Sequence, residues 1–320
     1  MGLCITVDIF SGLNNPSWEI RDPDRTRDCV EFFVRHRAAL ADIGSGFTGL
    51  GFRGVQVHFT DDIGCAGLPP AFELAGGGAQ DPYISAELAD RLLETMPPEP
   101  PAEGAYEAVE AGFSHELREM VRGEIQRIVG KTFGDSQSFA AAKAHQDDEL
   151  AAEVDEQVMT LGRRTAPCPW DSAPFNPEFW NHPAVQPYNN CYNYGVNYRT
   201  DTMAKPGRKH DYEIPATVTG QQVAQGLFKD GLRLFGVDCQ PPGGNRVILA
   251  LVTGAFPNGF RDFHFYRYHA EGHWSHKQAA NMARRTDNSG VLITNPYLCD
   301  RGIYTEWYGL FQSHNTVLIK

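Results

Sequence analysis

Alternating apolar and polar positions indicate two strands near the start of the chain. Residues 4–10, CITVDIF, and 52–59, FRGVQVHF, both show the period of two that is typical of a half-buried strand. Between them, residues 22–44 have apolar positions at helical spacing, with Asp22 as the cap and Pro23 in the first turn. We therefore predict a β-α-β start and a small α/β module of about 80 residues.

Helical patterns dominate the next part of the chain. We predict a short helix over 85–96 capped by Ser85, a Pro-rich spacer over 97–104, and longer helices over 105–130 and 136–164. The following stretch is rich in Pro and Trp, which favours irregular structure. We place a domain boundary there, so that 1–164 form an α/β and helical N-terminal region of unknown role and 165–320 form a second domain.

The second domain combines helices with several strands. A helix is predicted to begin near Cys191, and another spans 219–236. Strands are predicted over 245–254, 261–269, 274–277 and 290–295. Helices followed by a run of antiparallel strands are typical of an α+β fold, which is the class that we predict.

Composition narrows the function classes. The net charge of −12 argues against binding to nucleic acid or to an anionic membrane surface, and no apolar run reaches the length of a membrane span. Seven widely spaced cysteines without a C-x-x-C pair favour a reduced setting, and the N-terminus does not have the pattern of a signal peptide. We therefore expect a cytoplasmic protein with mostly buried thiols.

Cys191, in QPYNNCYNYGVNY, is the candidate nucleophile. A thiol at the start of a helix gains from the helix dipole, which stabilises its thiolate form. The histidine that a cysteine nucleophile requires is best sought on the strand 261–269, where His264 shares a face with Asp262 and Tyr266. A three-residue turn centred on Ala270 would place His264 beside His276, whereas a four-residue turn would put them on opposite faces.

These segments resemble the NlpC-type and wider papain-like cysteine peptidases. HFYRYHAEGHWSH (264–276) has the shape of their strand histidine followed by a second polar residue across a hairpin. QPYNNCYNYG (186–195) is similar to the papain pattern of a glutamine before the cysteine and an aromatic residue after it. The resemblance covers about 186–300.

This resemblance implies a papain-like α+β fold with an antiparallel sheet, and it assigns roles to individual residues. Cys191 would be the nucleophile, His264 the general base and His276 the orienting residue. Asn295, in LITNP, resembles the papain-type asparagine and is an alternative to His276, as is Asp287. The residues implied for the oxyanion hole and substrate are Gln186, Tyr188, Asn190 and Tyr192.

The predicted function is thiol-dependent hydrolysis or acyl transfer on a peptide or amide bond, with a peptide or amide-containing substrate and no cofactor or metal. Two alternatives stay open. One is a non-catalytic binding module in which Cys191 is buried and His264 is satisfied in the core. The other is a metal-dependent enzyme that uses the hairpin histidines His264, His269, His273 and His276.

Overall fold

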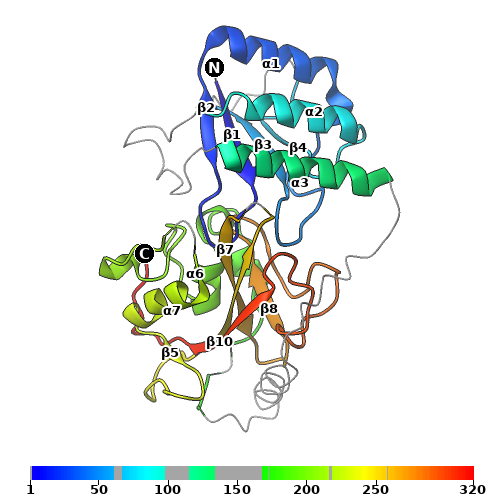
Figure 1. Cartoon of the computed structure of the whole chain (residues 1–320). Helices are drawn as coiled ribbons and strands as arrows, with labels where there is room; N and C mark the ends of the chain where they lie inside the picture. The colour runs from blue at the N-terminus through cyan, green and yellow to red at the C-terminus, as the bar shows by residue number, and fades with distance from the viewer. Residues whose placement is uncertain are drawn as a thin grey trace. The chain divides into compact units, whose positions relative to one another are not determined.

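The computed structural model describes residues 2–60, 67–97, 115–133 and 168–320, except 172, 216, 217 and 258. They form two compact units (Figure 1). The N-terminal unit comprises residues 1–10 and 14–137, and the C-terminal unit comprises residues 11–13 and 138–320. The predicted boundary near residue 164 and the predicted helix 136–164 lie outside the described residues.

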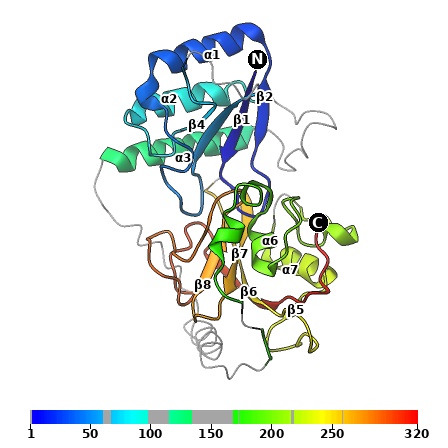
Figure 2. The same ribbon diagram turned by 180° about the vertical axis from the view of Figure 1, so that it is seen from behind.

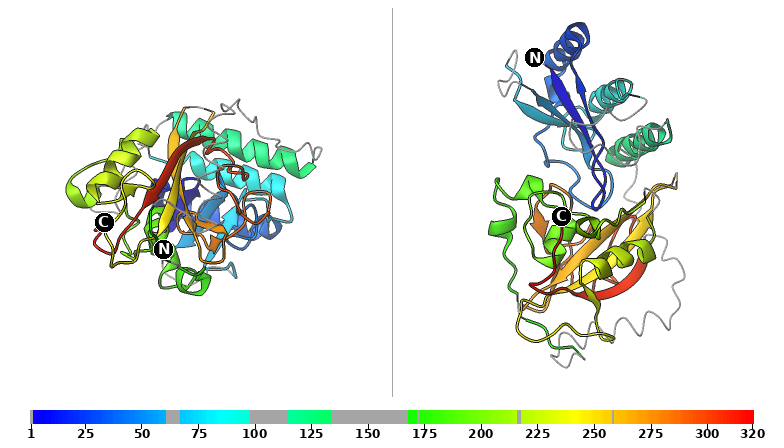
Figure 3. Two further views of the ribbon diagram at one scale, coloured as in Figure 1. Left: turned by 90° about the horizontal axis from the view of Figure 1, so that it is seen from below. Right: turned by 90° about the vertical axis from the view of Figure 1, so that its left-hand side faces the viewer.

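The N-terminal unit is an antiparallel sheet with helices on one face (Figure 3). Its strand order is β2-β1-β3-β4. The strands are β1 (Leu3–Asp8), β2 (Ser17–Ile20), β3 (Gly54–Phe59) and β4 (Ala71–Leu74). The helices are α1 (Pro23–Arg35), the 3-10 turn η1 (Arg37–Ala39), α2 (Pro82–Leu93) and α3 (His115–Phe133). The apolar side chains of Leu3, Ile5 and Val7 on the central strand β1 are fully buried, as the alternation predicts.

The predicted β-α-β crossover is wrong. The chain turns after β1 and adds β2 before α1, so that β3 pairs with β1 antiparallel rather than parallel. The cap of α1 is confirmed, because the Asp22 side chain accepts from the main-chain N–H of Arg25. For α2 the cap is Asp81, followed by Pro82. Ser85, predicted as that cap, is buried inside the helix and accepts from the N–H of Ala75.

The C-terminal unit is built on a six-stranded antiparallel sheet of order β5-β10-β6-β7-β8-β9. Its strands are β5 (Arg233–Leu234), β6 (Ile248–Ala255), β7 (Arg261–Tyr268), β8 (Trp274–Lys277), β9 (Ala283–Arg284) and β10 (Glu306–Gln312). Its helical segments are α5 (Pro177–Trp180), η2 (Gln186–Tyr188), α6 (Cys191–Val196), η3 (Arg208–His210) and α7 (Gly220–Lys229). Both units therefore mix helices with antiparallel sheet, so the α+β class is confirmed.

Helices cover one face of this sheet. α6 packs against β6, β7 and β8, and α7 packs against β6 and β10. Figures 1 and 2 show both helices on the same side of the strands. The opposite face is covered by the irregular segment after β9, because Tyr304 and the carbonyl of Thr286 both lie against histidines of β7 and β8.

Two details of the predicted C-terminal strands are wrong. Residues 290–295 form no strand but a tight loop with a single bridge, Thr286 to Leu292. Gly290 (φ 78°) turns the chain there, and Pro296 follows directly, so a ladder cannot extend. The strand β10 was not predicted, although it pairs with β6 along most of its length.

A disulfide joins Cys168 to Cys239, which departs from the expectation of reduced thiols. It ties the start of the described C-terminal segment to the loop after β5. Cys4, Cys29, Cys191 and Cys299 are free. Structural disulfides of this kind persist in oxidising compartments. Among the described residues, no helix combines the length and the apolar character that crossing a membrane requires.

Candidate functional site

Cys191 is the first residue of α6, as the sequence predicts. The Asn190 side chain caps the helix by accepting from the main-chain N–H groups of Tyr192 (3.0 Å) and Asn193 (3.2 Å). In return, the Asn193 side chain accepts from the N–H of Asn190 (3.1 Å), which completes a capping box. The capping residues Asn190 and Asn193 thus fix the residue at which α6 begins, and with it the position of Cys191.

The thiol of Cys191 is fully buried, and this reverses the predicted direction of its pKa. Burial, followed by the negative charge of Asp262, raises the pKa of Cys191 well above its ordinary value. A hydrogen bond from the main chain of Phe265 and the positive charge of Lys277 act in the opposite direction but are weaker. Cys191 therefore begins the helix as predicted, but its thiol stays protonated. The cost of burying a thiolate outweighs the stabilisation that the helix dipole offers it.

Lys277 fastens the segment that leads into Cys191. Its ammonium group is buried and donates to the carbonyl oxygens of Gln186 (2.7 Å), Ala279 (2.6 Å) and Asn189. A charge that is solvated by three peptide carbonyls holds the main chain in place, because moving any carbonyl leaves the ammonium without a partner. Lys277 carries no recognisable motif in the sequence and was not predicted as part of the site.

The two faces of β7 carry different chemistry. The ring of Phe265 lies 5.3 Å from that of Tyr192 on α6, and Arg267 donates to the Tyr194 carbonyl at 2.9 Å. Phe265 and Arg267 therefore face α6, and His264 projects from the other face, since side chains alternate along a strand. There its ring contacts those of Tyr266, His276 and Tyr304. None of these contacts is the thiol–imidazole pair that the sequence predicts.

His264 and His276 do meet, with 2.8 Å between Nε2 of the first and Nδ1 of the second. Their predicted same-face contact is confirmed, but the register differs. His276 lies opposite Tyr266, so the two histidines are diagonal neighbours and the three-residue turn is centred on Glu271 rather than Ala270. The predicted strand 274–277 has the observed limits of β8.

The hydrogen bonds of this pair define its tautomers. His276 Nε2 lies 3.0 Å from the Thr286 carbonyl, so it carries a hydrogen and donates it. Its Nδ1 therefore accepts, and Nε2 of His264 is the donor. Burial, assisted by the nearby charge of Arg284, lowers the pKa of His276 to about 3. His276 is thus neutral across the physiological pH range.

The residues implied for the oxyanion hole are engaged elsewhere. The Gln186 side chain donates to the carbonyl of Ala280 (3.1 Å), and Tyr188 is exposed on η2. Tyr192 is buried and its hydroxyl donates to Asp230 (2.7 Å). Gln186 and Tyr192, together with Asn190, which caps α6, therefore stabilise the C-terminal unit through bonds to other groups than the thiol.

The two alternatives to His276 lie in the loop 287–300. Asn295 accepts from the N–H of Tyr297 (2.9 Å) and starts a turn. Asp287 accepts from the main-chain N–H groups of Ser289 (3.0 Å), Val291 (2.9 Å) and Asp300 (3.0 Å). Asp287 is thus an organiser of the loop.

A second polar cluster, on the α6 side, was also missed. Ser275 Oγ lies within hydrogen-bond distance of both His269 Nε2 and the Tyr194 hydroxyl, and His269 Nδ1 lies 3.1 Å from the Ala173 carbonyl. Burial lowers the pKa of His269 to about 3. In the sequence, Ser275 and Lys277 alternate with Trp274 and His276 along β8. This alternation was the available signal that Ser275 and Lys277 lie on the face opposite to His276.

The hairpin histidines do not converge on one point. His264 and His276 form one pair, and His269 and His273 form another, with ring centroids 5.5 Å apart at the turn. Within the described ranges, no three His, Cys, Asp or Glu side chains gather as ligands for a metal ion. The metal alternative thus has no ligand set in this part of the chain.

Comparison with known proteins adds a relationship but no catalytic motif. No family model matches the chain, and no solved structure matches it. Insoluble matrix shell protein 1 from Ruditapes philippinarum is 41% identical over 138 residues, which cover 43% of this chain and 88% of the shell protein. Identity at this level over most of a relative's length indicates common descent. The chain therefore belongs to the same family as insoluble matrix shell protein 1.

Proposed function

We propose that this chain is a non-catalytic structural protein of an insoluble matrix, the setting that the name of its relative describes. The observation that carries the proposal is the family relation, with 41% identity over 88% of the shell protein. The candidate site agrees with it, because the thiol of Cys191 is inaccessible and uncharged, and the nearby polar groups bond to the protein itself.

Two further properties suit a matrix protein. The Cys168–Cys239 disulfide favours an oxidising, extracytoplasmic setting over the cytoplasmic one predicted from the sequence. A net charge of −12 favours association with cationic surfaces or with divalent cations over association with nucleic acid. Neither the disulfide nor the net charge depends on catalysis by this chain.

Fractionation of the producing cells tests this proposal. We expect the chain in the insoluble extracellular fraction, with the peptides around Cys168 and Cys239 linked to each other when digestion and mass spectrometry are done without reductant. Recovery of the chain in the soluble intracellular fraction, with both cysteines alkylatable, would overturn the structural role.

A second candidate function is thiol-dependent hydrolysis or acyl transfer on a peptide or amide bond, on a papain-like or NlpC-like fold. Two observations favour it: Cys191 begins a capped helix, and His264 and His276 lie in hydrogen-bond contact. This function requires a rearrangement that brings His264 from its own face of β7 to the thiol and opens a path for substrate.

The rate of Cys191 alkylation by iodoacetamide separates the two functions. For the structural protein we expect slow labelling at pH 6–9 that accelerates only when urea unfolds the chain, and no change in pH dependence in His264→Ala. For the enzyme, labelling is fast below the ordinary thiol pKa and is lost in His264→Ala. Cys4, which is half-buried, serves as an internal reference in the same digest.

A further inference from the structure

The 3-10 turn η3 lies in direct contact with α7, the helix that follows it in the chain. A Cβ on Gly226 of α7 would lie 2.5 Å from the carbonyl oxygen of Pro206, so this helix position requires a residue without a side chain. The Tyr212 hydroxyl bonds to the carbonyl of Gln222 on the same helix (3.0 Å). These contacts, one on each side of η3 in the chain, fix the place of η3 along α7.

Asp230 ends α7 with a buried carboxylate of which only one oxygen is hydrogen-bonded. It is the C-cap residue of the helix, and its side chain is 0% exposed. Oδ2 accepts from the Tyr192 hydroxyl and from the Gly207 N–H, both at 2.7 Å. Oδ1 has no hydrogen-bond partner among the residues that the structure describes. A buried carboxylate oxygen without a donor is costly, so a ligand that binds Oδ1 stabilises the folded chain.

This oxygen faces an imidazole. His210 Nε2, on η3, lies 3.8 Å from Asp230 Oδ1, and the His210 side chain is 40% exposed. The separation is too long for a direct hydrogen bond, which needs about 2.7–3.2 Å. It is too short for a bridging water, which would hold the two atoms about 4.5 Å apart. Two ligands of one zinc ion lie about 3.4 Å apart when each bond is about 2.1 Å long and the angle is tetrahedral.

We propose that Asp230 and His210 bind a zinc ion between Oδ1 and Nε2, with water completing its coordination. The donor set fits zinc, which combines carboxylate oxygen with imidazole nitrogen, whereas calcium and magnesium prefer oxygen ligands. The two atoms need to approach from 3.8 Å to about 3.4 Å, and the exposed His210 ring can make this adjustment. The Asp230 carboxylate stays in place, because Tyr192 and Gly207 hold its other oxygen.

The number of ligands and the neighbouring charges set the expected strength. Two protein ligands bind zinc more weakly than the four of a closed structural site. Arg208 and Lys209 lie on the same 3-10 turn as His210, and their positive charges oppose a cation. Glu213, whose carboxylate lies 3.9 Å from the Arg208 guanidinium, offsets one of these charges. We therefore expect one zinc ion per chain, with a dissociation constant on the order of 10–100 μM.

The zinc ion links η3 to the end of α7. Because the unfolded chain does not hold the two ligands together, binding stabilises the folded C-terminal unit, and this stabilisation increases with the zinc concentration. Both ligands belong to the C-terminal unit, so the site is complete within it. The site is separate from the hairpin histidines of β7 and β8, and it goes beyond the proposed matrix role without depending on it.

Calorimetric titration of the full chain with zinc chloride, without a histidine tag, tests the site. His210→Gln removes the exposed ligand, and Asp230→Asn removes the buried charge but keeps the shape of the side chain. Each should weaken zinc binding by about tenfold or more. The matched control is His182→Gln, which replaces another exposed histidine, one that accepts from the Ala184 N–H (3.2 Å), and it should bind zinc like the wild type. Equal affinity in the wild type and His210→Gln would overturn the proposal.

A measurement on the wild type alone guards against variants that fail to fold. Diethyl pyrocarbonate modifies exposed imidazoles, and peptide mass spectrometry follows each histidine separately. Zinc at about tenfold above the expected dissociation constant should slow the modification of His210 by about fivefold and leave that of His182 unchanged. Calcium should protect neither, because it prefers oxygen ligands. Modification of His210 at the same rate with and without zinc overturns the site. That outcome leaves the matrix proposal intact, because fractionation tests it separately.

Discussion

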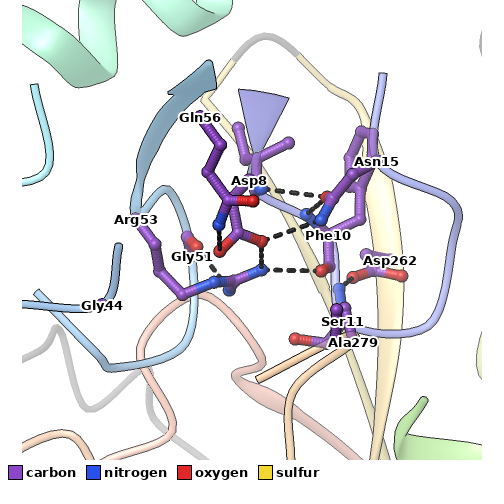
Figure 4. A network of polar contacts seen from close by, with 12 residues as sticks. Asp8, Phe10, Ser11, Asn15, Gly44, Gly51, Arg53, Gln56, Asp262 and Ala279 are labelled. Atoms are coloured by element: carbon purple, nitrogen blue, oxygen red, sulfur yellow. Dashed lines mark hydrogen bonds and ion pairs between the residues drawn. The ribbon is translucent and has the colours of Figure 1, made fainter. Parts of the chain in front are cut away.

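Buried charges are handled differently in the two units. In the N-terminal unit, Arg53 Nη2 lies 2.6 Å from Asp8 Oδ1, and both side chains are at most 5% exposed (Figure 4). In the C-terminal unit, Lys277 is surrounded by three carbonyl oxygens and Asp262 by three N–H groups. Arg53 also donates to the carbonyls of Gly51 and Phe10, and Asp262 also accepts from the Tyr304 hydroxyl. The difference is that the N-terminal charges include an ion pair, whereas the partners of Lys277 and most partners of Asp262 are peptide groups.

This difference determines what a substitution leaves behind. An ion pair can be removed as a pair, because both partners are side chains, and two neutral side chains of similar shape can replace it. A charge bound by peptide groups has partners that no substitution can remove. We therefore expect the C-terminal charges to be harder to replace than the N-terminal pair.

Lys277→Met should have the largest effect. The substitution leaves three carbonyl oxygens without their donor, and each unsatisfied carbonyl costs about 1–3 kcal/mol. We therefore expect the free energy of unfolding of the C-terminal unit to fall by about 5 kcal/mol. Urea unfolding followed by near-ultraviolet circular dichroism measures it. Lys209→Met, on an exposed side chain of η3, is the control and should change stability by less than about 0.5 kcal/mol. Equal effects would refute the role assigned to the carbonyls.

Arg53→Met should cost slightly less, about 4 kcal/mol, because it strands the buried carboxylate of Asp8 and removes the donor from the carbonyls of Gly51 and Phe10. The Asn15 and Gln56 amides still donate to that carboxylate, at 2.8 and 3.3 Å. The double variant Asp8→Asn/Arg53→Met should recover about 2 kcal/mol of the loss, since it removes the stranded charge. Hydrogen exchange of the β1 and β3 peptides measures the stability of the N-terminal unit alone. A double variant that is no more stable than Arg53→Met would mean that the stranded charge of Asp8 does not cause the loss.

The same contrast explains what the sequence could predict. Period-two alternation was sufficient for β7 and β8, because parity depends only on local spacing. The contact between His264 and His276 depended in addition on the length of the turn, which the sequence left open. The partners of Lys277 could not be predicted, since Gln186 and Asn189 bind it through carbonyls that every residue possesses. The burial of Cys191 was equally hidden, because the capping pattern around Asn190 is the same for an exposed helix and a buried one.

The N-terminal unit also holds a carboxyl group whose charge is poorly matched. Glu73 is 2% exposed, and burial raises its pKa to about 7, although the Gly44 N–H bonds to it (3.1 Å) and Arg53 opposes the shift. Because the folded pKa lies above the ordinary 4.5, the folded state holds the proton more tightly than the unfolded state does. Stability is therefore full below pH 4.5 and falls as pH rises toward 7, by about 3 kcal/mol in total.

Glu73→Gln should remove this dependence. The variant and the wild type should differ least below pH 4.5, and the variant should gain relative stability up to about pH 7, as hydrogen exchange of β3 and β4 peptides will show. Glu87→Gln, on the exposed side of α2, is the matched control and should leave the pH profile unchanged. A wild-type profile that is flat between pH 4.5 and 7 would refute the assignment.

The smallest expected effect is on a carboxylate with mixed partners. Asp230 accepts from the Tyr192 hydroxyl and from the Gly207 N–H, both at 2.7 Å, so it combines a side-chain partner with a main-chain one. Tyr192→Phe removes only the hydrogen bond from the hydroxyl. The hydrogen bond from the Gly207 N–H remains and keeps the carboxylate in place. We therefore expect a loss of about 1 kcal/mol in urea unfolding, against no measurable change in the exposed Tyr188→Phe. A loss near that of Lys277→Met would mean that side-chain partners hold the charges of this unit after all, and the distinction between the two units would fail.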